Sequence, residues 1–127
     1  YILPYVKELI NGLNRDGIPV IYFVKNGGTM LELVKEAGAD VLGLDWHVNL
    51  GKARDIIGPD IAVQGNLDPT VLYAPKDHIE REVQRILDEN AGRPGFIFNL
   101  GHGILPTVPP ENAIHMVECV HRLSGKR

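Results

Sequence analysis

One histidine is placed by the sequence where enzymes of the α/β class keep their functional residues. His102 lies between Gly101 and Gly103, directly after the apolar run at residues 96–98. The run predicts a buried parallel strand, and the two glycines allow a sharp turn that fixes the pose of the imidazole. Because α/β folds bind ligands beyond the carboxyl ends of their strands, we interpret His102 as a contact for a polar or anionic substrate. The alternative is a histidine that hydrogen-bonds only its own loop.

Three more polar residues follow apolar runs in the same way. Lys25 follows residues 20–24, Asp45 follows residues 41–44, and Asn66 follows residues 61–63. The carboxyl ends of parallel strands share one edge of a sheet, so we expect these three residues and His102 at one end of the fold.

Each of these three residues has a structural alternative to a role in substrate binding. Asp45 is a candidate cleft residue that could orient a substrate or His102, although an aspartate at a strand end more often ties down its own loop. Asn66 precedes Asp68-Pro69, a turn sequence, and is the second candidate cleft residue. Lys25 could attract a carboxylate, whereas lone lysines at strand ends are usually solvated.

The elements that must position these residues alternate between helix and strand. A helical spacing of apolar residues covers 2–13, and a further helical pattern follows each apolar run. Thr29 to Glu32 has the pattern of a capping box, Asn49 can cap the next helix, and Pro110 suits the first turn of the last helix. That last helix is expected to bury a set of apolar residues along one face. They are Ala113, Met116, Val117, Val120 and Leu123.

The resulting order is one helix followed by four βα units, which predicts an α/β fold with a parallel sheet. Four units are half of an eightfold (β/α)₈ barrel, which typically needs ~250 residues. A small open doubly wound sheet is the competing architecture. The sequence has neither GxGxxG nor GxxxxGK[ST], which weakens the nucleotide-binding version of that sheet.

Composition narrows the class of protein further. The 127 residues are 44% hydrophobic and 23% charged, as in an ordinary globular domain, and we interpret residues 1–127 as a single domain. A net charge of −3 gives no basic footprint, so nucleic acid is not expected as a partner. The sequence shows no membrane-spanning apolar run and no signal peptide, and its single cysteine, Cys119, fits a reducing cytoplasm. The chain begins at Tyr1 rather than Met, and we expect a fragment of a longer protein.

Three long stretches together resemble the C-terminal part of the uroporphyrinogen decarboxylase family. They are GADVLGLDWHVNLGKAR at 38–54, QGNLDPTVLYAP at 64–75 and FNLGHGILPTVPPENAIHMVECVHRLS at 98–124, and LPYVKELI at 3–10 fits the region just upstream. GLDW, QGNLDP and NLGHG are specific in combination, and they occur in order and at the family's spacing. The resemblance covers nearly the whole chain.

The resemblance implies the C-terminal half of a TIM-type barrel, a homodimer, and a cleft at the carboxyl ends of the strands. Family members remove four acetate carboxylates from uroporphyrinogen III to give coproporphyrinogen III in porphyrin and heme biosynthesis, without a metal or an organic cofactor. The family's arginine-rich motif, central aspartate and active-site tyrosine would lie before Tyr1. Of the residues that the family uses on its substrate, only the histidine of NLGHG is carried over, as His102.

Two other functions remain as alternatives. Cobalamin-dependent methyltransferases of the same superfamily bind zinc through a His-x-Cys motif after the strand that matches residues 20–24, and through a further cysteine near the last strand. This chain has Phe23-Val24-Lys25-Asn26 at the first place and His102 at the second. The chain could also be a non-catalytic half-barrel with open sheet edges that pair with another chain.

Because the zinc-binding motif is missing and Cys119 is the single cysteine, we expect no metal at any site and a packing role for Cys119. We expect no functional role for His115, which the pattern puts on a polar helix face.

Overall fold

A sheet of four parallel strands organises the chain. The computed structural model describes residues 1–125, and its strands are β1 (Ile21–Phe23), β2 (Val41–Gly43), β3 (Ala62–Leu67) and β4 (Phe96–Leu100), in the spatial order β1-β2-β3-β4. Every neighbouring pair is parallel. This confirms the predicted α/β class and βα repeat, because sequential parallel neighbours require a crossover between each pair.

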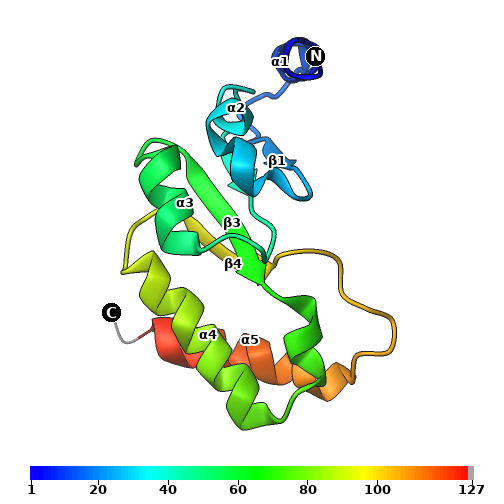
Figure 1. Cartoon of the computed structure of the whole chain (residues 1–127), viewed down its shortest axis with the longest axis vertical. Coiled ribbons are helices and arrows are strands. Elements are labelled where there is room, and N and C mark those ends of the chain that lie inside the picture. The colour runs from blue at the N-terminus through cyan, green and yellow to red at the C-terminus, as the bar shows by residue number, and fades with distance from the viewer. Residues whose placement is uncertain (126–127) are drawn as a thin grey trace.

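A helix follows each strand as expected, and Figure 1 shows α1 and α2 at one end of the long axis and α4 and α5 at the other. α1 spans Leu3–Gly12, α2 spans Leu31–Lys35, α3 spans Leu50–Ile57, α4 spans Lys76–Asn90 and α5 spans Pro110–Ser124. Two short 3₁₀ turns, η1 (Gly27–Met30) and η2 (Pro69–Tyr73), precede α2 and α4. None of the described helices is both long enough and apolar enough to cross a membrane.

The helix ends show which of the predicted capping residues are correct. Asn49 caps α3, since its Oδ1 accepts a hydrogen bond from the Lys52 backbone N–H at 2.9 Å, and Pro110 occupies the first turn of α5. The predicted capping box at Thr29 is wrong. Residues 27–30 form η1 instead, and α2 begins at Leu31 without a side-chain cap.

The third strand is longer than the sequence predicts. The apolar run predicts a strand over residues 61–63 with Asn66 beyond its end, but residues 64–67 continue β3 and pair with β4 as far as Leu67 and Leu100. A glycine and an asparagine weaken the local β pattern, and the pairing with β4 overrides it. As a result, Asn66 lies inside a strand rather than in the loop beyond it.

The prediction that β1 and β4 are fully buried is wrong. Ile21 and Phe23 are 48% and 42% exposed, and Ile97 in β4 is 45% exposed, whereas all of β2 is buried. Alternate residues Tyr22, Phe96 and Phe98 pack into the core. β1 and β4 are the edges of the sheet by their place in the strand order, and the exposed residues show that, within the described residues, only one face of each strand is covered.

The core has two adjoining parts. One lies between the sheet and helices α1 to α3, where Leu42, Leu50 and Val63 have no exposed surface. The other lies between α4 and α5, which run against each other (Figure 1), around Ile79 and Val83. Full burial of such side chains stabilises the fold by roughly 1.5–3 kcal/mol each.

On α5 the expected burial is only partly correct. Ala113, Met116, Val120 and Leu123 pack against the second part of the core, but Val117 is 46% exposed. The fully buried residue of this helix is Cys119, one turn from Met116 and at the centre of the face that meets α4. The apolar stripe thus keeps four of the five predicted residues and has Cys119 in place of Val117.

Candidate active-site edge

The carboxyl ends of the strands bring the predicted polar residues to one edge of the sheet. Lys25 follows β1, Asp45 follows β2, Asn66 is the second-last residue of β3, and His102 follows β4. The parallel register aligns these ends. The placement agrees with the predicted barrel edge, and contacts join Asp45, Asn66 and the loop that carries His102.

His102 is held between two aromatic rings. Its imidazole meets Trp46 edge to face, with ring centroids 5.8 Å apart, and meets Phe23 at 6.0 Å with an interplanar angle of 73°. Phe23 comes from β1 and Trp46 from the loop after β2. Edge contacts of this kind stabilise a ring orientation by about 0.5–1.5 kcal/mol each. The side chain is nevertheless exposed, so its polar atoms stay accessible.

A hollow of about 540 Å³ opens beside His102. It is lined by residues from β1, β3 and β4 and by the loop after β4, among them Phe23, Gln64, Asn99 and His102. Gln64 and Asn99 supply amide groups, and Phe23 supplies an apolar wall. The arrangement suits a ligand that has both apolar and hydrogen-bonding groups.

The two glycines around His102 have different roles. Gly101 is buried, and a Cβ atom at that position would lie 2.9 Å from the Asp45 carbonyl carbon and 3.0 Å from Trp46 Cα. A Cβ on Gly103 would meet nothing within 4 Å. Close approach of the loops after β2 and β4 therefore requires glycine at 101. Neither Gly101 nor Gly103 has a positive φ, so the turn itself does not require the conformational freedom of glycine.

Asp45 fastens loops together rather than reaching into the hollow. Its side chain is 1% exposed and accepts hydrogen bonds from the backbone N–H groups of Asn26 and His47, the latter at 2.9 Å. His47 Nδ1 lies 3.4 Å from the same carboxylate. Both carboxylate oxygens are thus engaged across the loops after β1 and β2, as the structural alternative for Asp45 anticipates.

Asn66 has a similar position and a different balance of hydrogen bonds. It is 2% exposed, and its Nδ2 donates to the backbone oxygens of Asp45 at 3.0 Å and Val48 at 2.6 Å. Its Oδ1 is buried without a hydrogen-bond partner. The amide therefore braces the loop between β2 and α3. Asn66 is not among the residues that line the hollow beside His102.

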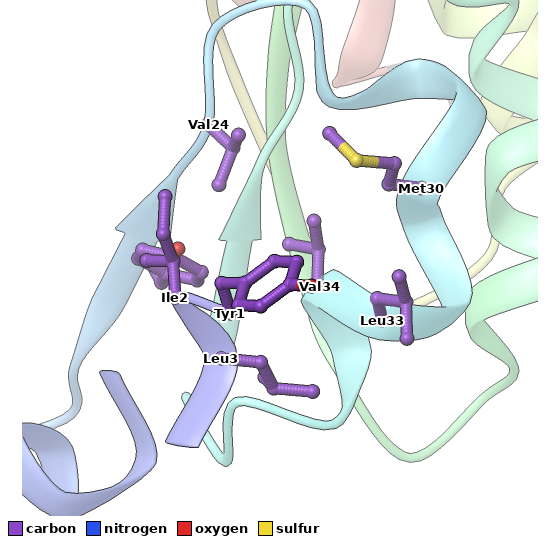
Figure 2. A pocket seen from close by; sticks show the side chains of 8 residues that line it. Tyr1, Ile2, Leu3, Val24, Met30, Leu33 and Val34 are labelled. Carbon is purple, nitrogen blue, oxygen red and sulfur yellow. The ribbon is translucent and has the colours of Figure 1, made fainter. Parts of the chain in front are cut away.

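A second pocket lies on the other side of β1 from Asp45, Asn66 and His102. It has a volume of about 320 Å³ and is bounded by apolar side chains of α1, β1 and α2, and Figure 2 shows Ile2 and Leu3 facing Val34 and Leu33 across it. None of the four strand-end candidates lines it. Its lining offers packing surface and little chemistry.

A group of three side chains that could ligate a metal lies between α4 and α5, and the sequence pattern did not predict it. Cys119 Sγ lies 3.4 Å from His115 Nε2, and Glu80 completes a cluster whose ligand atoms all lie within 4.8 Å of one another. His115 is thus in contact with the buried thiol rather than simply on a polar face. The four-residue spacing of His115 and Cys119 was the available signal, while Glu80 comes from another helix.

Comparison with known proteins gives the family. The family model described as uroporphyrinogen decarboxylase (URO-D) matches residues 1–123. The chain is 79% identical over 126 residues to the uroporphyrinogen decarboxylases of Geobacter metallireducens and Geobacter sulfurreducens, and 77% identical to that of Geotalea uraniireducens. Each match covers 99% of this chain and 37% of the relative, so the chain spans well under half the length of these relatives.

A solved structure supports the fold. A methyltransferase from Methanosarcina mazei superposes with a TM-score of 0.79 over 96% of this chain and 35% of its own, at 21% sequence identity. At that identity the likeness concerns the fold alone, and it agrees with a partial barrel. The family is shown by the sequence match instead. Because the family model covers residues 1–123, the chain belongs to the uroporphyrinogen decarboxylase family.

Proposed function

We propose that this chain is the C-terminal part of a uroporphyrinogen decarboxylase, a carboxy-lyase that converts uroporphyrinogen III to coproporphyrinogen III by removing four acetate carboxylates. The high identity to proteins of that name supports the proposal. The structural observation that carries it is the position of His102, which follows a parallel strand and lines the hollow at the carboxyl edge of the sheet.

His102 is the proposed substrate-binding residue. A neutral imidazole can donate one hydrogen bond to a carboxylate and accept one at its other nitrogen. Because Phe23 and Trp46 flank the ring, little side-chain freedom would be lost when a substrate binds. A tetrapyrrole with many carboxylates provides an acceptor for this donor, and Gln64 and Asn99 are amides in the same hollow.

The chemistry itself needs groups beyond those that this chain provides. Protonation of the pyrrole carbon next to an acetate creates an electron sink, and carbon dioxide then leaves with the electron pair of its bond flowing into the ring. A carboxylate near the pyrrole nitrogens would stabilise the cation, and arginines would bind the acid side chains. We propose that these groups belong to the part of the family's length that this chain does not span, and that no metal or organic cofactor takes part.

Further properties follow from the same resemblance as proposals. We propose that the full-length enzyme is a cytoplasmic homodimer whose ligand is uroporphyrinogen, with neither nucleic acid nor a membrane as partner. The acidic charge balance and the free Cys119 fit these proposals. The methyltransferase alternative has less support, because Val24-Lys25-Asn26 after β1 offers no thiolate or imidazole ligand.

A chimaera tests the proposal directly. This chain is joined to the preceding residues of the Geobacter metallireducens relative, and the relative itself is the positive control. We expect the chimaera to form coproporphyrinogen and carbon dioxide, and the 127-residue chain alone to form neither. A chimaera that folds like the relative but yields no product would contradict the proposal, and activity of the isolated chain would show that the chemistry needs no further groups.

A further inference from the structure

Three side chains that can ligate a divalent metal ion converge between α4 and α5. Cys119 and His115 lie one helical turn apart on α5, and Glu80 faces them from α4. The thiol is almost fully buried, while the imidazole and the carboxylate are partly exposed. A thiolate, an imidazole and a carboxylate are together typical ligands of Zn²⁺.

The spacing of the ligand atoms is close to what such an ion requires. Tetrahedral zinc with bonds of about 2.0–2.3 Å places its ligand atoms roughly 3.3–3.8 Å apart. Cys119 Sγ and His115 Nε2 are 3.4 Å apart, and all three ligand atoms lie within 4.8 Å. The single helix α5 thus already sets the Cys–His edge of a tetrahedron, and a rotation of the partly exposed Glu80 side chain of α4 would bring in the third ligand.

A cation already occupies this corner of the molecule. The Arg122 guanidinium lies 3.0 Å from Glu80 Oε1 and 3.6 Å from Cys119 Sγ. The Arg122 side chain is 50% exposed, so it can move into solvent without leaving an unpaired buried charge. Glu80 and Cys119 therefore already attract a positive charge. A metal ion would place that charge closer to both side chains than the guanidinium does.

Proton release would accompany binding. Burial raises the pKa of the Cys119 thiol, against the Arg122 contact, which lowers it, while Glu80 and Glu118 raise it further. Zn²⁺ binds cysteine as the thiolate, so binding would release the thiol proton. His115 Nε2 also lies 3.2 Å from the Lys76 carbonyl oxygen and would exchange that contact for the metal.

We propose that Cys119, His115 and Glu80 form a Zn²⁺ site that joins α4 to α5, with water completing the coordination. The site contains none of the strand-end residues, and it departs from the expectation of a metal-free protein that the sequence alone suggests. It is independent of the proposed decarboxylase activity.

Cobalt titration of the purified protein tests the site, because Co²⁺ replaces Zn²⁺ and reports its ligands in the visible and near-ultraviolet spectrum. We expect a thiolate-to-cobalt charge-transfer band at one equivalent, with the intensity of tetrahedral d–d bands, and displacement of both by Zn²⁺. Absence of the band from the folded wild-type protein would overturn the proposal.

Single variants assign the ligands. Cys119→Ser should abolish the charge-transfer band, and His115→Gln and Glu80→Gln should each weaken Zn²⁺ binding by at least about tenfold, since even changes behind a ligand typically cost 10–100-fold. His121→Gln is the matched control, because His121 is exposed on the same helix. An unchanged band in Cys119→Ser, or wild-type affinity in a folded His115→Gln, would refute the site.

Arg122→Gln tests the site through an expected gain of Zn²⁺ affinity instead of a loss. Removing the competing guanidinium should tighten Zn²⁺ binding, whereas a purely structural ion pair with Glu80 would leave the affinity unaltered. Circular dichroism and a thermal melt of each variant confirm that it remains folded. Equal or weaker Zn²⁺ affinity in Arg122→Gln would contradict the proposed competition.

Discussion

The rings of His102 and Trp46 meet edge to face, with centroids 5.8 Å apart and an interplanar angle of 88°. This contact joins the loop after β4 to the loop after β2, two segments that are more than fifty residues apart in the chain. Gly101, next to His102, is also tied to β3, because its N–H donates to the carbonyl oxygen of Leu67 at 2.7 Å. The pose of His102 therefore depends on neighbouring strands as well as on its own loop.

Gly101→Ala should destabilise the fold by about 1–3 kcal/mol, the usual cost of forcing an extra carbon into a packed site. The new Cβ would press against the Asp45 and Trp46 backbone, which cannot yield as a flexible side chain would. Urea denaturation measures the effect. Gly103→Ala is the control, and it should stay within about 0.5 kcal/mol of wild type because its Cβ would meet nothing. Equal losses in the two variants would contradict a specific contact at position 101.

Asn66→Leu should lower the free energy of unfolding by about 1–3 kcal/mol, because the carbonyl oxygens of Asp45 and Val48 lose their buried donor. Asn66→Asp should be worse, since it places a carboxylate against those two oxygens. Asn14→Asp is the surface control, as Asn14 is exposed after α1. A thermal melt in which Asn66→Asp matches Asn14→Asp would show that the amide does not brace the loop.

The stability contributed by Asp40 should disappear in acid. A hydrogen bond from the Val20 N–H, together with the Arg15 guanidinium, holds the pKa of Asp40 below its usual value near 3.8. A carboxyl whose pKa is lower when folded stabilises the protein above pH 3.8 and loses that effect as the pH falls through the folded pKa. Asp40→Asn should therefore melt below wild type at pH 7, and the gap should close toward pH 3.

The control for that experiment is Asp60→Asn, which changes an exposed carboxylate. Its melting temperature should follow wild type at every pH. A gap between Asp40→Asn and wild type that persists unchanged at pH 3 would show that packing, rather than the charge on Asp40, accounts for the loss.

Much of the fold is predictable because its signals are local. Helical spacing, Asn49 as a cap and Gly58 with a φ of 86° mark element ends within a few residues of each other. The extension of β3 through Asn66 is set by pairing with β4, thirty residues away, and no local pattern encodes it. Likewise, an apolar run indicates a strand, but only its neighbours decide whether Ile21 and Ile97 are covered.

In the candidate site, too, some features follow from local sequence and others depend on residues that are distant in the chain. Strand-end position indicated His102, Asp45 and Asn66 as candidates, whereas the rings that flank His102 come from β1 and the loop after β2 and were not predicted. Asp45 illustrates why residue type alone leaves function open, because a buried carboxylate with two backbone donors already has its partners. The Glu80 contribution to the cysteine cluster depends on how α4 packs against α5, which sequence spacing does not give.

The role of His102 in substrate binding is the central claim, and kinetics of the chimaera test it. A hydrogen bond to a charged group is worth about 1.5–3 kcal/mol, so His102→Ala should lower kcat/KM by roughly 10–100-fold without unfolding the protein. His102→Asn retains a donor and should lose less. His121→Ala, an exposed change on α5, serves as the control and should leave kinetics unaltered.

The most direct measurement is kcat/KM for uroporphyrinogen decarboxylation by His102→Ala, taken beside its thermal melt. If His102 binds substrate, kcat/KM falls at least tenfold while the melting temperature stays near that of wild type. If His102 only braces its loop, the melting temperature falls and the folded enzyme turns over at the wild-type rate, which would contradict the assignment.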